Sequence, residues 1–115
     1  MDTLLFKRNT FTYSYKGGLK TSYYEDLLAI ESDKPFVKLN LIDSSILVRA
    51  SLNFVEMNLQ QCYVRISRQV IVNINMAQQI TLKNGSYWIQ LSKGLEYKIS
   101  ERRQKDVCFA FVKNT

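Results

Sequence analysis

The sequence contains no histidine, and this absence narrows the functions open to it. Histidine is the commonest general base at neutral pH and the commonest metal ligand, so Ser/His/Asp and Cys/His catalytic sets are excluded. Gly17-Gly18 lacks the spacing of a phosphate loop and the Lys-Ser or Lys-Thr that follows one. The carboxylates of Glu25-Asp26 and of Glu31 with Asp33 have the chemistry of an acid/base pair, but solvated loop charges are far commoner. We expect a protein that is not an enzyme and that uses no cofactor and no metal.

Cysteine, proline and glycine are scarce, with two, one and four residues. Cys62 and Cys108 lie far apart among apolar neighbours, so they predict buried free thiols in a reducing cytosol rather than a zinc site. Because proline and glycine are so few, no segment resembles an interdomain linker. A length of 115 residues predicts one domain over 1–115, in which residues 1–10 form an N-terminal extension. No apolar run is long enough to cross a bilayer, and no signal-peptide pattern opens the chain. We therefore expect a soluble, cytoplasmic protein with no membrane partner.

The charge is unbalanced towards the basic side. Lysine and arginine number 16 against 10 aspartates and glutamates, which gives a formal net charge of +6. This balance favours polyanionic partners such as nucleic acid. It also lies in the range that simply keeps a small domain soluble, so charge alone leaves both interpretations open.

Alternation with a period of two residues dominates the chain. In FTYSY the aromatic residues Phe11, Tyr13 and Tyr15 fall on one side, and FVKLNLI places its apolar residues opposite Lys38 and Asn40. Such runs are typical of half-buried strands. The turns between them are marked by Gly17-Gly18, Asp43-Ser44-Ser45, Asn84-Gly85 and Lys93-Gly94. Asn-Gly tolerates positive φ at both positions, so the pattern predicts short antiparallel strands joined by tight turns.

Two segments depart from this alternation. Ser51 is a candidate N-cap for a helix of two to three turns, since Leu52, Val55 and Leu59 follow at near-helical spacing. Ser100 is a second candidate N-cap, because Glu101 follows it and complements a helix dipole. The residues after this second start are consistent with a helix or with a final strand. The prediction is a mainly β fold with one or two short helices.

Basic residues gather in three separate segments. Lys34 and Lys38 flank a Pro-Phe turn, Arg65 and Arg68 lie three residues apart, and a third group surrounds the start of the last helix. Arginine can bind guanine with two hydrogen bonds, while lysine and serine can bind phosphate. If the fold brings the segments to one edge, they form a discontinuous cationic surface. Otherwise each segment is an independent solvated face, which composition alone slightly favours.

Four blocks of sequence occur in a distinctive order. They are DLLAIES (26–32), VRASLNFVEMNL (48–59), CYVRISRQVIVNINMAQQI (62–80) and YKISERRQKDV (97–107). The first is similar to a D-I-x-x-I-E strand and the second to a segment leading into a short helix. The third resembles an aromatic residue followed by R-x-H-R-S, an apolar pair and V-N, and the fourth resembles P-V-S-R-R-R. Together, from about Phe11 to Phe111, they resemble the LytTR family of bacterial DNA-binding domains.

The resemblance implies an elongated arrangement of small antiparallel sheets whose loops, rather than a recognition helix, enter successive major grooves on one face of DNA. It implies that Arg68 contacts a base, that Arg65 contacts phosphate or forms a structural ion pair, and that Ser100 is both an N-cap and a phosphate donor. The DNA-binding residues predicted on this basis are Lys34, Phe36, Lys38, Arg65, Ser67, Arg68, Gln69, Ser100, Arg102, Arg103 and Lys105.

The sequence also departs from the family pattern. Ser67 replaces the usual histidine, Gln69 replaces the usual serine, and Glu101 stands where a basic residue is frequent. Glutamate can accept a hydrogen bond from cytosine, although we favour a helix-dipole role for Glu101. Asn73 matches the asparagine of V-N and is expected to hold a turn.

The resulting prediction is a transcriptional regulator, or its DNA-binding module, with double-stranded DNA as its partner. A lone small module binds weakly, so a second copy on a neighbouring half-site is also expected. The alternative is a non-catalytic β domain that uses its basic edge for protein interaction or ligand sensing.

Overall fold

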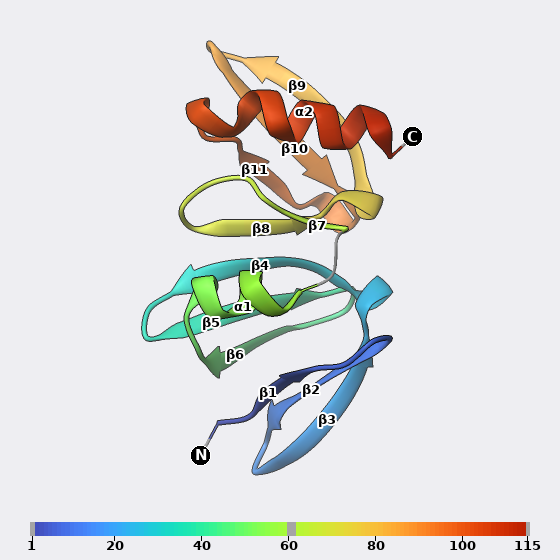
Figure 1. The fold of residues 1–115 in the computed structure, drawn as a ribbon, viewed down its shortest axis with the longest axis vertical. Helices are drawn as coiled ribbons and strands as arrows, with labels where there is room; N and C mark the ends of the chain where they lie inside the picture. Colours follow the sequence, from blue (N-terminus) through green and yellow to red (C-terminus); the bar gives the residue numbers. More distant parts are fainter. Residues whose placement is uncertain (1, 60–61, 115) are drawn as a thin grey trace.

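The computed structural model describes residues 2–59 and 62–114, which form three antiparallel sheets stacked along one long axis (Figure 1). In spatial order, the first sheet contains β1 (Leu4–Phe6), β2 (Thr10–Tyr15) and β3 (Gly18–Tyr23). The second contains β6 (Ser45–Arg49), β5 (Phe36–Leu41), β4 (Leu27–Asp33), β8 (Val70–Asn73) and β7 (Tyr63–Arg65). The third contains β11 (Glu96–Lys98), β10 (Ser86–Leu91) and β9 (Ala77–Lys83). The extents of 44 × 27 × 24 Å confirm the predicted elongated, mainly β fold.

Two α-helices and four 3₁₀ turns complete the described chain. The helices are α1 (Leu52–Asn58) and α2 (Gln104–Lys113). The 3₁₀ turns are η1 (Tyr24–Asp26), η2 (Ile74–Met76), η3 (Ser92–Gly94) and η4 (Glu101–Arg103). No helix among the described residues is long and apolar enough to cross a membrane.

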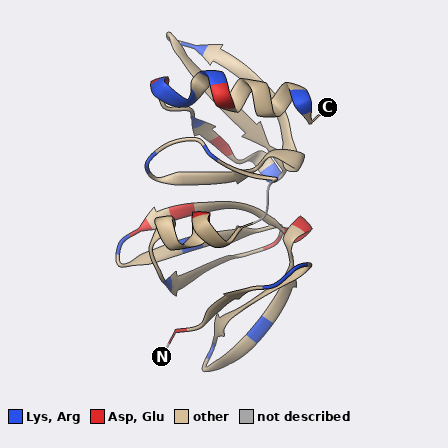
Figure 2. Cartoon of the chain, viewed as in Figure 1, with Lys and Arg blue, Asp and Glu red and all other residues tan. Residues whose placement is uncertain are grey.

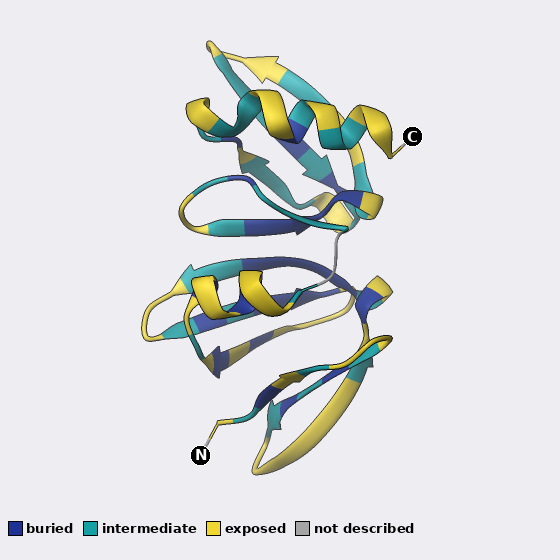
Figure 3. Cartoon of the chain, viewed as in Figure 1, coloured by how far each residue is buried: buried dark blue, intermediate teal, exposed yellow. Residues whose placement is uncertain are grey.

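The five-stranded sheet separates two hydrophobic cores, because successive side chains of a strand point to opposite faces. Ile30 and Ile71 belong to the core that packs against α1 and the first sheet. Their neighbours Ala29 and Val72 belong to the other core, which packs against the third sheet and α2. Figure 3 shows these buried positions concentrated in the central sheet and on the strands facing it. The central sheet is therefore the rigid base from which the loops of the molecule project.

Local rules account for several elements. The Ser51 side chain accepts a hydrogen bond from the Phe54 N–H at 3.1 Å, which confirms it as the N-cap of α1. Asn84 and Gly85 have φ of 52° and 79° and join β9 to β10, as the Asn-Gly pattern predicts. The Asn73 side chain accepts from the Asn75 N–H at 3.0 Å and holds the expected turn.

Other sequence expectations need correction. Ser100 precedes η4 rather than α2, and its side chain makes no capping hydrogen bond. The first hairpin turn is formed by Lys16 and Gly17, both with positive φ, while Gly18 already belongs to β3. Cys62 and Cys108 are free, but they are half-buried rather than buried.

The segment predicted as an N-terminal extension contributes to the fold. Leu4–Phe6 pairs with β2, and the Leu4 side chain lies in the core. The first sheet therefore begins before the blocks that carry the family resemblance.

A polar cluster joins the central sheet to the third sheet. Asn40 is only 4% exposed, and its Nδ2 donates to Glu31 at 2.6 Å and to the Tyr97 hydroxyl at 2.9 Å. The Tyr97 hydroxyl in turn donates to Glu31 at 2.6 Å. Burial, followed by the neighbouring Glu31 carboxylate, raises the pKa of Tyr97 above its ordinary value. The buried Asn40 and the half-buried Glu31 and Tyr97 thus satisfy one another, and their hydrogen bonds link the central sheet to the third sheet.

Candidate nucleic-acid interface

The loop between β7 and β8, residues 66–69, is anchored on both sides. The Gln69 carbonyl accepts from the Ser32 N–H of β4 at 2.8 Å, and the Ile66 carbonyl accepts from the Ser100 N–H at 2.9 Å. Ile66 is fully buried, whereas Arg68 and Gln69 are exposed. The loop therefore has a rigid base and an exposed tip. We call it the β7–β8 loop.

Arg65, the last residue of β7, ties this loop to α1. Its Nε donates to the Ser67 carbonyl at 2.8 Å, and its Nη2 donates to the Arg68 carbonyl at 2.6 Å. Its Nη1 donates to Asn53 Oδ1 at 3.0 Å and to Glu56 Oε1 at 2.8 Å, the latter being an ion pair. Of the two roles expected for Arg65, the structure contains the ion pair. A contact between Arg65 and phosphate stays a prediction.

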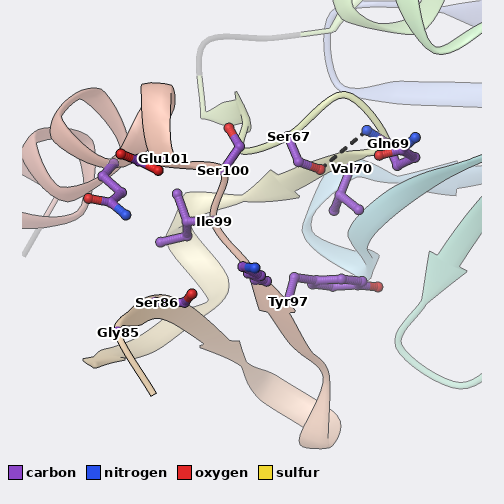
Figure 4. A pocket seen from close by; sticks show the side chains of 11 residues that line it. Ser67, Gln69, Val70, Gly85, Ser86, Tyr97, Ile99, Ser100 and Glu101 are labelled. Carbon is purple, nitrogen blue, oxygen red and sulfur yellow. Dashed lines mark hydrogen bonds between the residues drawn. The ribbon is translucent and has the colours of Figure 1, made fainter. Parts of the chain in front are cut away.

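Two grooves flank the β7–β8 loop. A groove of about 540 Å³ is lined by Lys34, Arg65 and Arg68, together with the start of α1. A groove of about 690 Å³ on the other side is lined by Ser67, Gln69 and the segment around Ser100 (Figure 4). Because residues of the same loop line both grooves, the loop is the wall between them. The fold thus brings together six of the predicted DNA-binding residues: Lys34, Arg65, Ser67, Arg68, Gln69 and Ser100.

The other predicted residues are not among those that line these two grooves. The family resemblance places Phe36 and Lys38 in a DNA-facing loop after the opening strand, but both belong to strand β5 and are half-buried. The Arg49 guanidinium lies over the Phe36 ring, 5.9 Å from its centroid. Arg102 and Arg103 lie in η4, and Lys105 lies in the first turn of α2.

Three segments that carry predicted DNA-binding residues lie along one edge of the molecule. The β4–β5 turn, the β7–β8 loop and η4 all lie on the left of Figure 1, and Figure 2 shows basic residues on each of them. Lys34, Arg68 and Arg102 are exposed. Among the residues that the structure describes, none of the three has an ion-pair partner. We call this set of segments the loop edge. Its cations are available to an anionic partner.

Sequence reasoning did not identify Asn53 and Glu56 as contributors to this site. The spacing of Asn53 and Glu56 does indicate that the two side chains lie together, since residues three apart on a helix share a face. No local rule, however, links that face of α1 to an arginine nine residues beyond Glu56 in the chain.

Fold and site together define a class: a mainly β binding domain that presents cationic loops along one edge. Among residues 2–59 and 62–114, no cluster of three metal-ligating side chains is present. The family model for the LytTr DNA-binding domain matches residues 19–110, and the chain belongs to this family. Membership supports DNA binding and a regulatory role, with double-stranded DNA as the partner, in a family defined by binding and not by catalysis.

A solved structure shares the fold. It is the LytTr DNA-binding domain of a methyl-accepting/DNA response regulator from Bacillus cereus, with a TM-score of 0.79 and 16% sequence identity. The match covers 90% of this chain and 97% of the other. A search of curated proteins finds no match.

Proposed function

We propose that this protein binds double-stranded DNA in a sequence-specific manner, through the loop edge, as a bacterial transcriptional regulator or the DNA-binding module of one. The observation that carries the proposal is the β7–β8 loop, which has a fixed backbone and an exposed arginine between two grooves. A fixed backbone lowers the ordering cost of binding. The long dimension of the molecule, 44 Å, exceeds one turn of B-DNA, about 34 Å, so the molecule is long enough to lie along more than one turn of DNA.

The exposed side chains divide into two roles. Arg68 is suited to guanine and Gln69 to adenine, because each can form two hydrogen bonds with an edge of its base. Lys34, Arg102 and Lys105 are suited to phosphate, which positions the protein without reading sequence.

The remaining predicted residues support these contacts. Ser67 offers a hydroxyl donor in the larger groove, which Ser100 also lines. The Ser100 Oγ itself is buried and has no hydrogen-bond partner among the described residues. Arg103 belongs to η4 within the loop edge, and Phe36 and Lys38 lie in β5, which follows the β4–β5 turn; these three residues complete the proposed contact surface.

The first test is selection of binders from a random duplex library, followed by titration of the selected duplex and a scrambled duplex at several salt concentrations. Neutralising about five phosphates predicts a slope near −4.5 for log affinity against log salt. Enrichment of a short motif repeated at about one helical turn supports a sequence-specific regulator that acts from one face of DNA.

Other outcomes count against the proposal. Binding without enrichment leaves only a nonspecific basic surface. Absence of binding at low salt overturns the DNA proposal in favour of a β domain whose basic edge binds an acidic protein.

A further inference from the structure

The guanidinium of Arg65 has little capacity left for a ligand. Arginine has five N–H donors, and four of those of Arg65 bind Ser67, Arg68, Asn53 and Glu56. The side chain is only 10% exposed. Arg65 therefore acts inside the protein, as a clamp between α1 and the β7–β8 loop.

The loop end of this clamp sets the backbone where DNA contact is proposed. The two carbonyls held by Arg65 belong to Ser67 and Arg68, at 2.8 and 2.6 Å. The Ser67 Oγ also accepts from the Gln69 N–H at 3.2 Å (Figure 4). The direction in which Arg68 and Gln69 leave the loop thus depends on the position of one guanidinium.

The helix end of the clamp is fixed to the core. Leu52 and Val55 of α1 are 5% and 0% exposed, and Ser51 caps the helix. Asn53 and Glu56 project from this anchored helix and hold Arg65 Nη1 at 3.0 and 2.8 Å.

We infer that Glu56 and Asn53 are positioning residues for sequence-specific DNA binding, acting through Arg65 on the β7–β8 loop without touching DNA. The inference rests on the proposed function, and it adds Glu56 and Asn53, which are not among the residues proposed to contact DNA. It has a distinctive consequence at Glu56. A carboxylate near phosphates repels them, so electrostatics alone predicts that removing Glu56 strengthens DNA binding. The clamp predicts weaker binding to the selected sequence, because the loop must then be ordered on binding.

Two variants at Glu56 separate these effects. Glu56→Gln removes the charge but keeps an acceptor for Arg65, and Glu56→Ala removes both. Affinity for the selected duplex should fall in the order wild type, Glu56→Gln, Glu56→Ala, with a total loss of about 2- to 10-fold. Affinity for a scrambled duplex should stay constant or rise. Electrostatics alone instead places both variants above wild type on both duplexes.

Asn53→Ala provides a second test with no change in charge, and it should also weaken binding to the selected duplex only. Glu25→Gln is the matched control, because it removes one exposed negative charge from η1, on the opposite edge of the molecule (Figure 2). This control should preserve the preference for the selected duplex.

A readout without DNA excludes a purely global loss of stability. Amide hydrogen exchange should accelerate at residues 67–69 in Glu56→Ala while the strands of the central sheet keep wild-type protection. A wild-type chain with no preference for the selected duplex overturns both proposals. Wild-type preference that Glu56→Ala and Asn53→Ala leave unchanged overturns only the clamp.

Discussion

Replacement of Arg68 by alanine is the sharpest test of the proposed base contact. The Arg68 side chain is exposed and makes no hydrogen bond or ion pair within the described residues, whereas its carbonyl is held by Arg65. Alanine leaves that carbonyl in place. The substitution should therefore remove an outward contact without loosening the loop, and thermal stability should stay close to wild type because an exposed site away from caps and cores costs at most about 0.5 kcal/mol.

The expected loss of affinity follows from the geometry of the contact. An arginine that binds guanine with two hydrogen bonds contributes about 1–3 kcal/mol of discrimination. At about 1.4 kcal/mol for each tenfold change, this corresponds to about 5- to 150-fold weaker binding to the selected duplex. Binding to a scrambled duplex should change much less, and preference should relax at one base pair.

Fluorescence anisotropy with the selected duplex, the scrambled duplex and single-base variants would measure these effects. Lys113→Ala is the matched control, since it removes one exposed positive charge at the C-terminal end of α2, away from the loop edge (Figure 1). Arg68→Lys keeps the charge but loses the planar fork, so it should also relax the preference. Equal weakening of all duplexes by Arg68→Ala, with a salt slope reduced by about 0.9, would show a phosphate contact and refute base recognition.

The remaining predictions concern stability. Ser51→Ala should lower the free energy of unfolding by about 1 kcal/mol in urea titrations, because the Phe54 N–H loses its capping acceptor; an unchanged urea midpoint would contradict this. Burial raises the pKa of the Tyr63 and Tyr97 hydroxyls, so both favour the neutral form in the folded chain. Their stabilising contribution is complete below the unfolded tyrosine pKa of about 10 and is lost as pH rises towards the higher folded values. Unfolding free energies measured from about pH 8 to 11 should fall, and Tyr63→Phe should make that fall shallower; equal slopes for both proteins would exclude Tyr63 as a cause.

Much of the fold follows from local sequence rules. Alternation in FTYSY predicts a strand with Phe11 and Tyr13 inward, and both side chains are fully buried in β2. Asn84-Gly85 predicts the β9–β10 turn because both residues tolerate positive φ. These features need only residues close together in sequence, which is why the sequence predicts them.

Where local rules compete, the sequence is a weaker guide. Ser100 and Glu101 resemble a helix start, but the Ser100 N–H binds the Ile66 carbonyl, and a 3₁₀ turn precedes α2. Asn40 alternates with apolar residues as an outward position would, yet the third sheet covers it and supplies Tyr97 as a partner. In both cases the deciding partner lies more than thirty residues away in the chain.

The sequence alone determined the chemistry of this protein: a basic chain without histidine, with arginines beside an apolar strand and an overall order of blocks that resembles a DNA-binding family. Only the tertiary structure decided which role each of the arginines Arg65 and Arg68 has. Arg65 turns inward because α1 brings Asn53 and Glu56 to it, whereas the Arg68 side chain has no acceptor among residues 2–59 and 62–114 and is exposed. Two residues of the same type, three positions apart, differ in role because hydrogen-bond partners are set by packing between distant segments and not by residue type.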